Sequence, residues 1–332
     1  MALLEVKNLD ARFAVRGGDL TALRGISFSL DKGERLGLVG ESGAGKSVAA
    51  FSILNLIAKP GYIAGGQILF EGRDLAAMSE RELRGIRGNR IAMIFQDPMM
   101  TLNPVLTIGT QMVEAIQAHR KISKKEARAI ALDRLQKVQI PSPEKRLDQY
   151  PHELSGGMRQ RVIIAIALLL DPEIIIADEP TTALDVTIQA EIMDLLLNLC
   201  EQENVALMLI THDLGVVSKV TQRMLVMYSG RIIEQGPTRE IINDAQHPYT
   251  QGLINALPQM GEPGDRLFQI PGAMPSLKNV PTGCPFHPRC HFATEQCKHS
   301  MPEYVRSGNV DVACFEVANL IEQEKQMQEA ES

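Results

Sequence analysis

The sequence predicts an α/β protein with a largely parallel sheet and a second, smaller, loop-rich unit at its carboxyl end. Short apolar runs rich in Val, Ile and Leu alternate with longer segments of helical periodicity. Two runs, 174–177 and 207–210, are apolar at every position, which is typical of strands covered on both faces. From about Gly236 the chain becomes rich in Pro, Gly, His and Cys. We expect a main domain over residues 1–255 and a C-terminal domain over 256–332.

The same patterns predict the individual helices and strands. A segment with helical periodicity and many Lys, Arg, Glu and Ala spans 108–138 and is closed by Pro141 and Pro143, where proline blocks continuation. We expect it to belong to a helical subdomain, about 97–165, inserted in the α/β domain. The polar, Glu- and Gln-rich residues 317–332 are expected to form a frayed helix. The expected strands are 3–6, 26–30, 35–39, 68–70, 91–95, 174–177, 206–210 and 224–227.

Composition and charge narrow the function class. The 332 residues are 45% hydrophobic and 22% charged, which is close to the average of folded globular proteins. The longest apolar run, Val162 to Leu170, is far shorter than the roughly 20 residues that cross a bilayer. The first residues lack the pattern of a signal peptide, so we expect a cytosolic location. A net charge of −6 has the wrong sign for a protein that binds nucleic acid phosphates.

A phosphate-binding loop (P-loop, Walker A) is predicted between a strand and a helix. The strand 35–39 leads into a G-x-x-x-x-G-K-S pattern and then into a helix-forming segment. The glycines let backbone N–H groups turn toward phosphate oxygens, and the helix N-terminus adds positive partial charge. Lys46 is expected to reach the β- and γ-phosphates, and the Ser47 hydroxyl to bind Mg²⁺. The nucleotide-binding residues predicted in this loop are Gly40, Ser42, Gly43, Ala44, Gly45, Lys46 and Ser47.

Two carboxylates end the apolar strand 174–177. Ligands of open α/β sheets bind at the carboxyl ends of the strands, so Asp178 and Glu179 are placed near a bound nucleotide. Asp178 is predicted to orient Mg²⁺ or its water. Glu179 is predicted to accept a proton from the water that attacks the γ-phosphate.

The segment Leu154-Ser155-Gly156-Gly157-Met158-Arg159-Gln160-Arg161 resembles the signature sequence of ATP-binding-cassette (ABC) ATPases. A serine hydroxyl and glycine amides at a helix start can form a second anion site. In that family Ser155, Gly156 and Gly157 would close on ATP held by a partner subunit. Met158 stands where the family most often has Gln. The resemblance implies a RecA-like P-loop ATPase core with an antiparallel β edge and a helical subdomain.

Other elements of the same family follow in order along the chain. Gln96 resembles the Q-loop glutamine, which would sense Mg²⁺ and water and couple to the membrane partner. Residues Thr182 to Asp185 resemble the D-loop of the dimer interface. His212 resembles the switch histidine that contacts the γ-phosphate. Phe13 stands where the family stacks an aromatic ring, usually tyrosine, on adenine. The resemblance thus implies catalytic roles for Glu179, His212 and Gln96, and ATP and Mg²⁺ as cofactors.

Three segments resemble the ATPase subunits of bacterial dipeptide and oligopeptide importers: 95–104, 177–186, and His247-Pro248-Tyr249-Thr250 with 256–258. This branch implies a second homologous ATPase, two transmembrane permeases and an extracytoplasmic solute-binding protein as partners. It implies a peripheral position on the cytoplasmic face of the inner membrane. Importers of nickel, glutathione or opines share the branch and remain alternatives for the solute.

Two other function classes were weighed against the importer ATPase. A soluble ABC ATPase acting on DNA or ribosomes is disfavoured, because the segment between Ser47 and Ile174 lacks long heptads and the chain has one phosphate loop. A metal-binding regulatory module with a vestigial ATPase is disfavoured because every expected catalytic residue is present. Neighbouring genes for permeases and a secreted binding protein would distinguish the importer subunit from both.

Four of the five cysteines, Cys284, Cys290, Cys297 and Cys314, cluster in the C-terminal domain. Their spacing alone leaves structural thiols, Zn²⁺ and a [4Fe–4S] cluster open, and a reducing compartment disfavours disulfides. The histidines 287, 291 and 299 could substitute in a zinc site. The importer branch carries such a cysteine set with an iron–sulfur cluster, so the resemblance implies [4Fe–4S], with Zn²⁺ as the alternative. Cys200 is expected to be a buried thiol.

Overall fold

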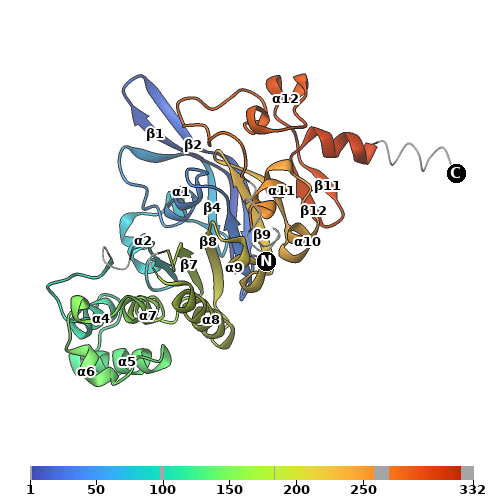
Figure 1. The fold of residues 1–332 in the computed structure, drawn as a ribbon. Helices are drawn as coiled ribbons and strands as arrows, with labels where there is room; N and C mark the ends of the chain where they lie inside the picture. Colours follow the sequence, from blue (N-terminus) through green and yellow to red (C-terminus); the bar gives the residue numbers. More distant parts are fainter. Residues whose placement is uncertain (1, 98–100, 183, 258–268, 323–332) are drawn as a thin grey trace. The chain divides into compact units, whose positions relative to one another are not determined.

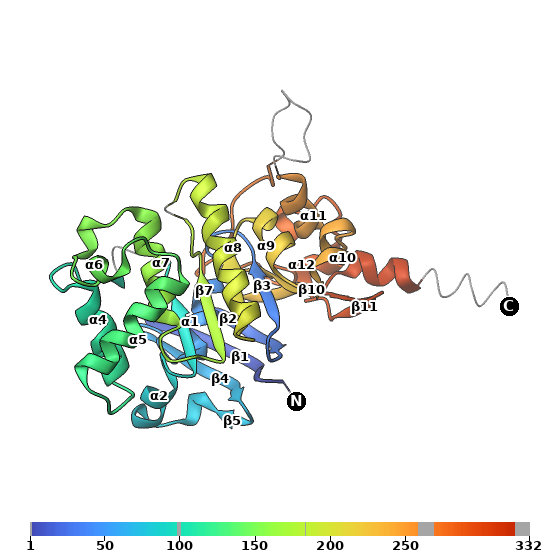
Figure 2. The same cartoon turned by 90° about the horizontal axis from the view of Figure 1, so that it is seen from below.

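The computed structural model describes residues 2–97, 101–182, 184–257 and 269–322. Residues 98–100, Ala183, Pro258 and the end of the predicted C-terminal helix, 323–332, lie outside this part of the chain. The chain divides into two compact units (Figures 1 and 2). The first unit comprises residues 1–3, 30–35 and 77–210, and the second comprises 4–29, 36–76 and 211–332.

The first unit has a parallel sheet at its centre. Strand β7 (Ile174–Asp178) lies between β6 (Ile91–Ile94) and β8 (Ala206–Thr211), and both pairings are parallel. Every residue of β7 and β8 is buried. The prediction that these apolar runs form strands covered on both faces is therefore confirmed.

Helices make up most of the rest of the first unit. Ser123 begins one of them with a capping box, in which its hydroxyl accepts from the Glu126 N–H and the Glu126 carboxylate accepts from the Ser123 N–H. Among the described residues, three α-helices lie wholly within 97–165, the range expected for a helical subdomain, whose boundaries stay a prediction. The helices are α2 (Glu80–Ile86), α4 (Ile108–Gln117), α5 (Lys124–Lys137), α6 (Pro143–Leu147), α7 (Gly156–Ala167) and α8 (Val186–Gln202).

The second unit contains an antiparallel sheet in the order β2-β1-β4-β5. Its strands are β1 (Leu4–Val15), β2 (Gly18–Leu30), β4 (Gly61–Phe70) and β5 (Arg73–Asp74). In the register of β1 with β4, Leu4 lies opposite Phe70 and Phe13 opposite Gly61. The sequence predicted only the buried ends of β1, β2 and β4. Their remaining parts mix exposed, half-buried and buried positions and contain polar residues and glycines, so no continuous apolar run marks them.

The second unit also contains five strands of mixed direction. Strand β3 (Arg35–Val39) runs parallel to β9 (Arg223–Tyr228), and β10 (Arg231–Pro237), β12 (Val310–Val312) and β11 (Val305–Ser307) continue antiparallel. The last three strands were not predicted, because they are short or carry charged residues. The helices are α1 (Lys46–Ile53), α9 (Leu214–Val220), α10 (Thr238–Asn243), α11 (Pro248–Asn255) and α12 (Glu295–His299).

An aromatic core joins the C-terminal segment, defined here as residues 269–322, to the rest of the second unit. The ring centroids of Tyr228 and Tyr249 lie 4.7 Å apart, and those of Tyr228 and Phe286 lie 5.2 Å apart, both edge to face. Val39, at the end of β3, belongs to the same buried cluster. The C-terminal segment therefore packs directly behind the strand that enters the phosphate loop. The division expected at residue 255 stays a prediction.

Within the described residues, none of the helices combines the length and the apolar character that a membrane crossing requires.

Candidate functional site

The predicted phosphate loop joins β3 to α1 in the second unit. Gly40 follows β3 with a φ of 151°, and a Cβ at this position would lie 2.4 Å from the Met227 carbonyl oxygen. A larger residue would therefore displace the backbone of β9. Gly45 is the N-cap of α1 and has a left-handed backbone. The loop thus makes the tight strand-to-helix turn that a phosphate site requires.

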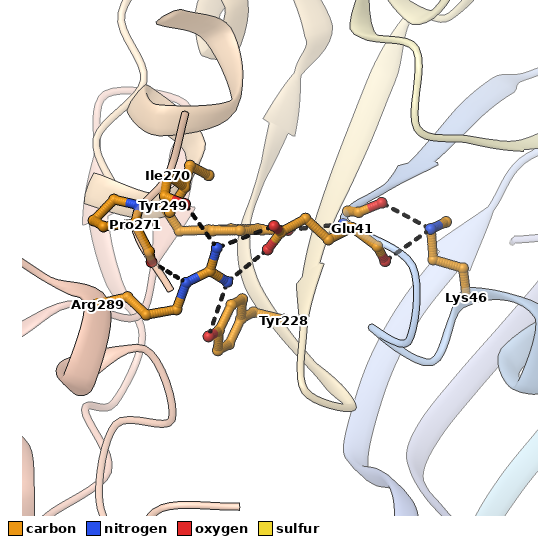
Figure 3. Close-up of polar contacts among 8 residues, drawn as sticks. Glu41, Lys46, Tyr228, Tyr249, Ile270, Pro271 and Arg289 are labelled. Atoms are coloured by element: carbon orange, nitrogen blue, oxygen red, sulfur yellow. Dashed lines mark hydrogen bonds and ion pairs between the residues drawn. The ribbon is translucent and has the colours of Figure 1, made fainter. Parts of the chain in front are cut away.

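Lys46 is the first residue of α1 and is only 6% exposed. Its Nζ donates to the carbonyl oxygen of Gly40 at 2.7 Å and to that of Glu41 at 3.1 Å (Figure 3). The ammonium is therefore folded back over its own loop. A phosphate oxygen would offer it a charged acceptor, which makes a stronger hydrogen bond than a neutral carbonyl.

The other predicted residues of the loop differ in exposure. Ser42 and Gly43 are exposed, whereas Ala44 is fully buried and its carbonyl accepts from the Gly230 N–H at 2.8 Å. Ser47 is half-buried in the first turn of α1. The loop is thus anchored at Ala44 and open at Ser42 and Gly43.

Two further predicted nucleotide contacts lie in the second unit. Phe13 is half-buried near the end of β1. His212 directly follows β8 and is exposed. The next residue, Asp213, accepts hydrogen bonds from Gly215 and Val216 N–H groups and so begins α9. The local chain therefore turns into a helix immediately after His212.

The catalytic carboxylates end β7 in the first unit. Asp178 is 3% exposed, and Glu179 is half-buried with a φ of 47°. The Gln96 Nε2 donates to Glu179 Oε2 at 3.4 Å, and the Thr182 hydroxyl donates to the same oxygen at 2.8 Å. The left-handed backbone at Glu179 is a strained conformation for a residue with a side chain, and such conformations cluster at functional sites. Gln96 and Glu179, 83 residues apart, are thus brought together.

The predicted signature segment begins α7 in the first unit. Ser155 is the N-cap, and its hydroxyl accepts from the Met158 N–H at 3.3 Å. Ser155 and Gly156 are exposed, and Gly157 is half-buried. The start of a 12-residue helix is thus open to solvent, which suits an anion at its N-terminus.

The structure groups the predicted site residues in two sets. The second unit holds the phosphate loop, Phe13 and His212, and the first unit holds Gln96, Asp178, Glu179 and the signature segment. The joint arrangement of the two sets around one nucleotide stays a prediction, as do the individual roles of these residues.

The four C-terminal cysteines line one pocket in the second unit, together with His247, Phe286 and His287. All four are free thiols. Among the described residues, no group of three or more His, Cys, Asp or Glu side chains converges as a single metal ion would require. Cys200 lies elsewhere, on α8, and is buried as predicted.

Burial governs the protonation of the pocket cysteines. It raises the pKa of Cys284 to about 11, and neighbouring cysteines add to the rise. Burial also raises the pKa of Cys290 and of Cys314. Four thiolates in one apolar pocket are therefore unfavourable unless cations neutralise them. A metal or metal–sulfur group in this pocket would therefore require each of its cysteine ligands to be ionised.

Sequence reasoning missed the residues that support the phosphate loop from behind. Arg289 binds the Glu41 carboxylate through both terminal nitrogens, at 2.7 and 3.0 Å (Figure 3). The Tyr249 hydroxyl accepts from the Glu41 N–H at 2.8 Å. In the sequence, the segment His247-Pro248-Tyr249 indicates only a family resemblance. Glu41 stands at a variable position of the phosphate-loop motif and Arg289 in no predicted motif, so the sequence does not indicate their pairing across 248 positions.

His247 and Glu234 hold Tyr249 in place. The His247 Nδ1 accepts from the Tyr249 N–H at 3.0 Å, and Pro248 starts α11. Burial lowers the pKa of His247 to about 3, so the imidazole is neutral and its Nδ1 can accept. The Glu234 carboxylate accepts from the N–H groups of Gln246 and His247. Tyr249 is thereby fixed at the start of α11.

Comparison with known proteins gives two family matches. Residues 23–182 match the model of the ABC transporter family. Residues 233–297 match the model of the oligopeptide/dipeptide transporter C-terminal region. The first match contains the phosphate loop and the signature segment, and the second contains Tyr249 and Arg289.

Similar proteins extend the match along nearly the whole chain. A probable peptide ABC transporter ATP-binding protein of Sinorhizobium fredii is 49% identical over 96% of this chain and 97% of its own length. The chain belongs to the ABC transporter ATP-binding proteins. The dipeptide transport ATP-binding protein DppD of Bacillus subtilis is 49% identical over 94% of both chains. The oligopeptide transport ATP-binding protein OppD of the same organism is 52% identical over 88% of this chain and 82% of its own.

Solved structures of ABC cassettes share the fold. The dimeric bacterial ABC transporter cassette MJ0796 has a TM-score of 0.63 and 29% identity, covering 71% of this chain and 99% of its own. A post-hydrolysis state of MJ0796, bound to ADP and phosphate, has a TM-score of 0.62 at the same identity and coverage. The predicted ABC-type P-loop fold is confirmed, and the chain is an ABC-type ATPase.

Proposed function

We propose that this ABC ATPase energises the uptake of dipeptides or oligopeptides. The observation that carries the proposal is a phosphate loop of the required geometry in a chain that matches peptide-transport ATP-binding proteins over more than nine-tenths of its length. The C-terminal family match supports the same branch.

In the proposed mechanism, the phosphate loop binds ATP and Lys46 moves from the Gly40 and Glu41 carbonyls to the phosphates. Mg²⁺, when bound, neutralises charge that develops on the phosphates, and Ser47, Asp178 and Gln96 are its candidate ligands. Glu179 takes the proton of the attacking water, while Gln96 and Thr182 orient its carboxylate.

The proposed assembly contains two cassettes. The signature residues of one cassette, Ser155, Gly156 and Gly157, would complete the nucleotide site of the other cassette. His212 would contact the γ-phosphate of the ATP bound to its own cassette. The dimeric cassettes among the similar structures support this arrangement. We propose a second, homologous ATPase as the partner, two transmembrane permeases, and an extracytoplasmic solute-binding protein. The chain would then lie at the cytoplasmic face of the inner membrane as a peripheral subunit.

The imported solute is tested by assembling the chain with its partner ATPase, permeases and binding protein in liposomes and measuring ATP hydrolysis. Dipeptides or oligopeptides are expected to stimulate hydrolysis several-fold. Stimulation only by Ni²⁺, glutathione or an opine would replace the peptide proposal with that alternative. Full, concentration-independent hydrolysis by the dilute chain alone would contradict the two-cassette mechanism and favour a soluble ATPase.

We also propose that Cys284, Cys290, Cys297 and Cys314 hold a structural [4Fe–4S] cluster. A single Zn²⁺ requires its four sulfur ligands to lie about 2.3 Å from one point, and the described residues contain no such convergence. A cubane binds its ligands at four separate corners and is better matched to thiols that line the wall of a pocket. When bound, the cluster would neutralise the thiolates of Cys284, Cys290 and Cys314, whose charged forms burial otherwise disfavours.

The cluster proposal predicts a measurable composition. Protein purified without oxygen is expected to be brown and to contain about four iron and four sulfide per chain. Cys290→Ser should bleach it, whereas Cys200→Ser, which changes a buried cysteine outside the pocket, should leave the colour unchanged. Stoichiometric zinc without sulfide would establish the alternative metal instead.

A further inference from the structure

The side chain of Arg289 is 5% exposed and is saturated with acceptors. Its two terminal nitrogens bind the two oxygens of Glu41, and its Nε donates to the Pro271 carbonyl oxygen at 2.8 Å. The guanidinium lies 5.9 Å from the ring centroids of Tyr228 and Phe286. The geometry is that of a bidentate ion pair whose cation is buried and held by the C-terminal segment, while the Glu41 side chain is 31% exposed.

Glu41 is the second residue of the phosphate loop, and three parts of it are engaged (Figure 3). Its carboxylate binds Arg289, its N–H donates to the Tyr249 hydroxyl, and its carbonyl accepts from Lys46 at 3.1 Å. Arg289 and Tyr249 lie on the side of Glu41 away from Lys46. Glu41 therefore connects the C-terminal segment to the lysine that is expected to meet the phosphates.

Local sequence alone does not fix this part of the loop. Ser42 and Gly43 are exposed, and Gly40 and Gly43 have positive φ, so the loop has wide conformational freedom in an unfolded or unsupported state. A phosphate cradle works only when its N–H groups are held in one arrangement before the anion arrives. The contacts from Arg289 and Tyr249 supply such a restraint at Glu41.

We propose that Arg289, with Tyr249, is a positioning residue for ATP binding, which clamps Glu41 and so preorganises the phosphate loop. The contacts of the C-terminal segment with Glu41 would thereby raise the affinity of the phosphate loop for ATP. Arg289 directly precedes Cys290, which lines the cysteine pocket. A structural change at Cys290 would therefore alter the position of Arg289 and, through the ion pair, the position of Glu41 in the phosphate loop.

The test measures the affinity of the purified full chain for a fluorescent ATP analogue with Mg²⁺. Arg289→Gln and Glu41→Gln are each expected to raise the Kd by about 10-fold. Because both remove the same ion pair, the double variant should be no weaker than the weaker single variant. Arg289→Lys keeps the charge but loses the two-point geometry and is expected to recover only part of the affinity.

Arg306→Gln is the matched control, because Arg306 forms an ion pair with Asp311 at 2.9 Å in the same segment but is 60% exposed. Its Kd should equal that of the parent. In the assembled complex, Arg289→Gln should raise KM for ATP about 10-fold and keep kcat within about a factor of two, since Glu179 is untouched. A general loss of folding would instead lower kcat.

Two results would overturn the proposal: a parental Kd in both Arg289→Gln and Glu41→Gln, or effects that multiply in the double variant. If Arg289→Gln fails to fold, Glu41→Gln decides the question alone, because it leaves the C-terminal segment intact. All of these measurements use ATP binding or ATP-dependent kinetics. They are therefore independent of which solute is imported and of the metal in the cysteine pocket.

Discussion

Glu179→Gln is expected to lower ATP hydrolysis by about 10²-fold or more while leaving ATP binding at the parental level. The amide cannot accept the proton of the attacking water, but it keeps the size of the side chain and one oxygen for the hydrogen bonds from Gln96 and Thr182. Asp178 and the phosphate loop are unchanged, so the affinity for ATP and Mg²⁺ should persist. Single-turnover hydrolysis and nucleotide titration of the assembled complex separate the two effects.

Glu191→Gln is the control for this experiment. Glu191 lies in the same unit, on α8, and its side chain is 60% exposed with only a long, 3.5 Å contact to Arg161. Neutralising it removes one carboxylate without touching the end of β7, so parental hydrolysis is expected. A Glu179→Gln rate within about a factor of two of the parent would remove Glu179 from the role of general base.

The sequence was most informative where a residue type is dictated by its immediate surroundings. The glycines of the phosphate loop, Lys46 and the buried strand β7 follow from local steric and burial requirements. Burial on both faces produces an unbroken apolar run, and a tight strand-to-helix turn requires glycine. Strand β3 was accordingly predicted at its observed bounds, Arg35–Val39.

The sequence was least informative where partners are distant or exposed. The outer half of β1 mixes buried, half-buried and exposed positions and carries charges, so no apolar pattern in the sequence marks the full length of the strand. The pairing of Glu41 with Arg289 depends on the packing of Tyr228, Tyr249 and Phe286, which brings segments 248 residues apart into contact. Glu41 occupies a variable position of the phosphate-loop motif and Arg289 lies in no predicted motif, so only the tertiary fold identifies them as partners.

The contact between the predicted catalytic residues Gln96 and Glu179 is also only partly predictable from the sequence. The hydrogen bond from Gln96 to Glu179 joins the ends of two neighbouring parallel strands, β6 and β7. Sequence order predicts that such ends lie on one edge of a sheet, but it does not predict which oxygen is occupied. The structure adds that Gln96 and Thr182 share Glu179 Oε2. This contact, which the sequence analysis did not predict, supports the proposal that Gln96 orients the Glu179 carboxylate.

Lys46→Ala is expected to weaken ATP binding itself, by about 30- to 150-fold, which corresponds to the roughly 2–3 kcal/mol of a hydrogen bond to a charged group. Lys46 is 6% exposed, its ammonium lies against the Gly40 and Glu41 carbonyls, and it is the one Lys or Arg among residues 40–47, so no other side chain of the loop can supply its charge. Nucleotide titration of the purified chain measures the loss. Lys219→Ala, at the end of α9, removes one positive charge from the same unit and should bind ATP normally.

The Lys46 and Glu179 variants should fail in opposite ways. Lys46→Ala should be partly rescued by raising the ATP concentration, because the catalytic carboxylate is intact, whereas Glu179→Gln should remain inactive at saturating ATP. Lys46→Arg retains the charge on a longer, planar group and should bind more tightly than the alanine variant but less tightly than the parent. An unchanged ATP affinity in Lys46→Ala would mean that the phosphates bind elsewhere than in the loop of residues 40–47.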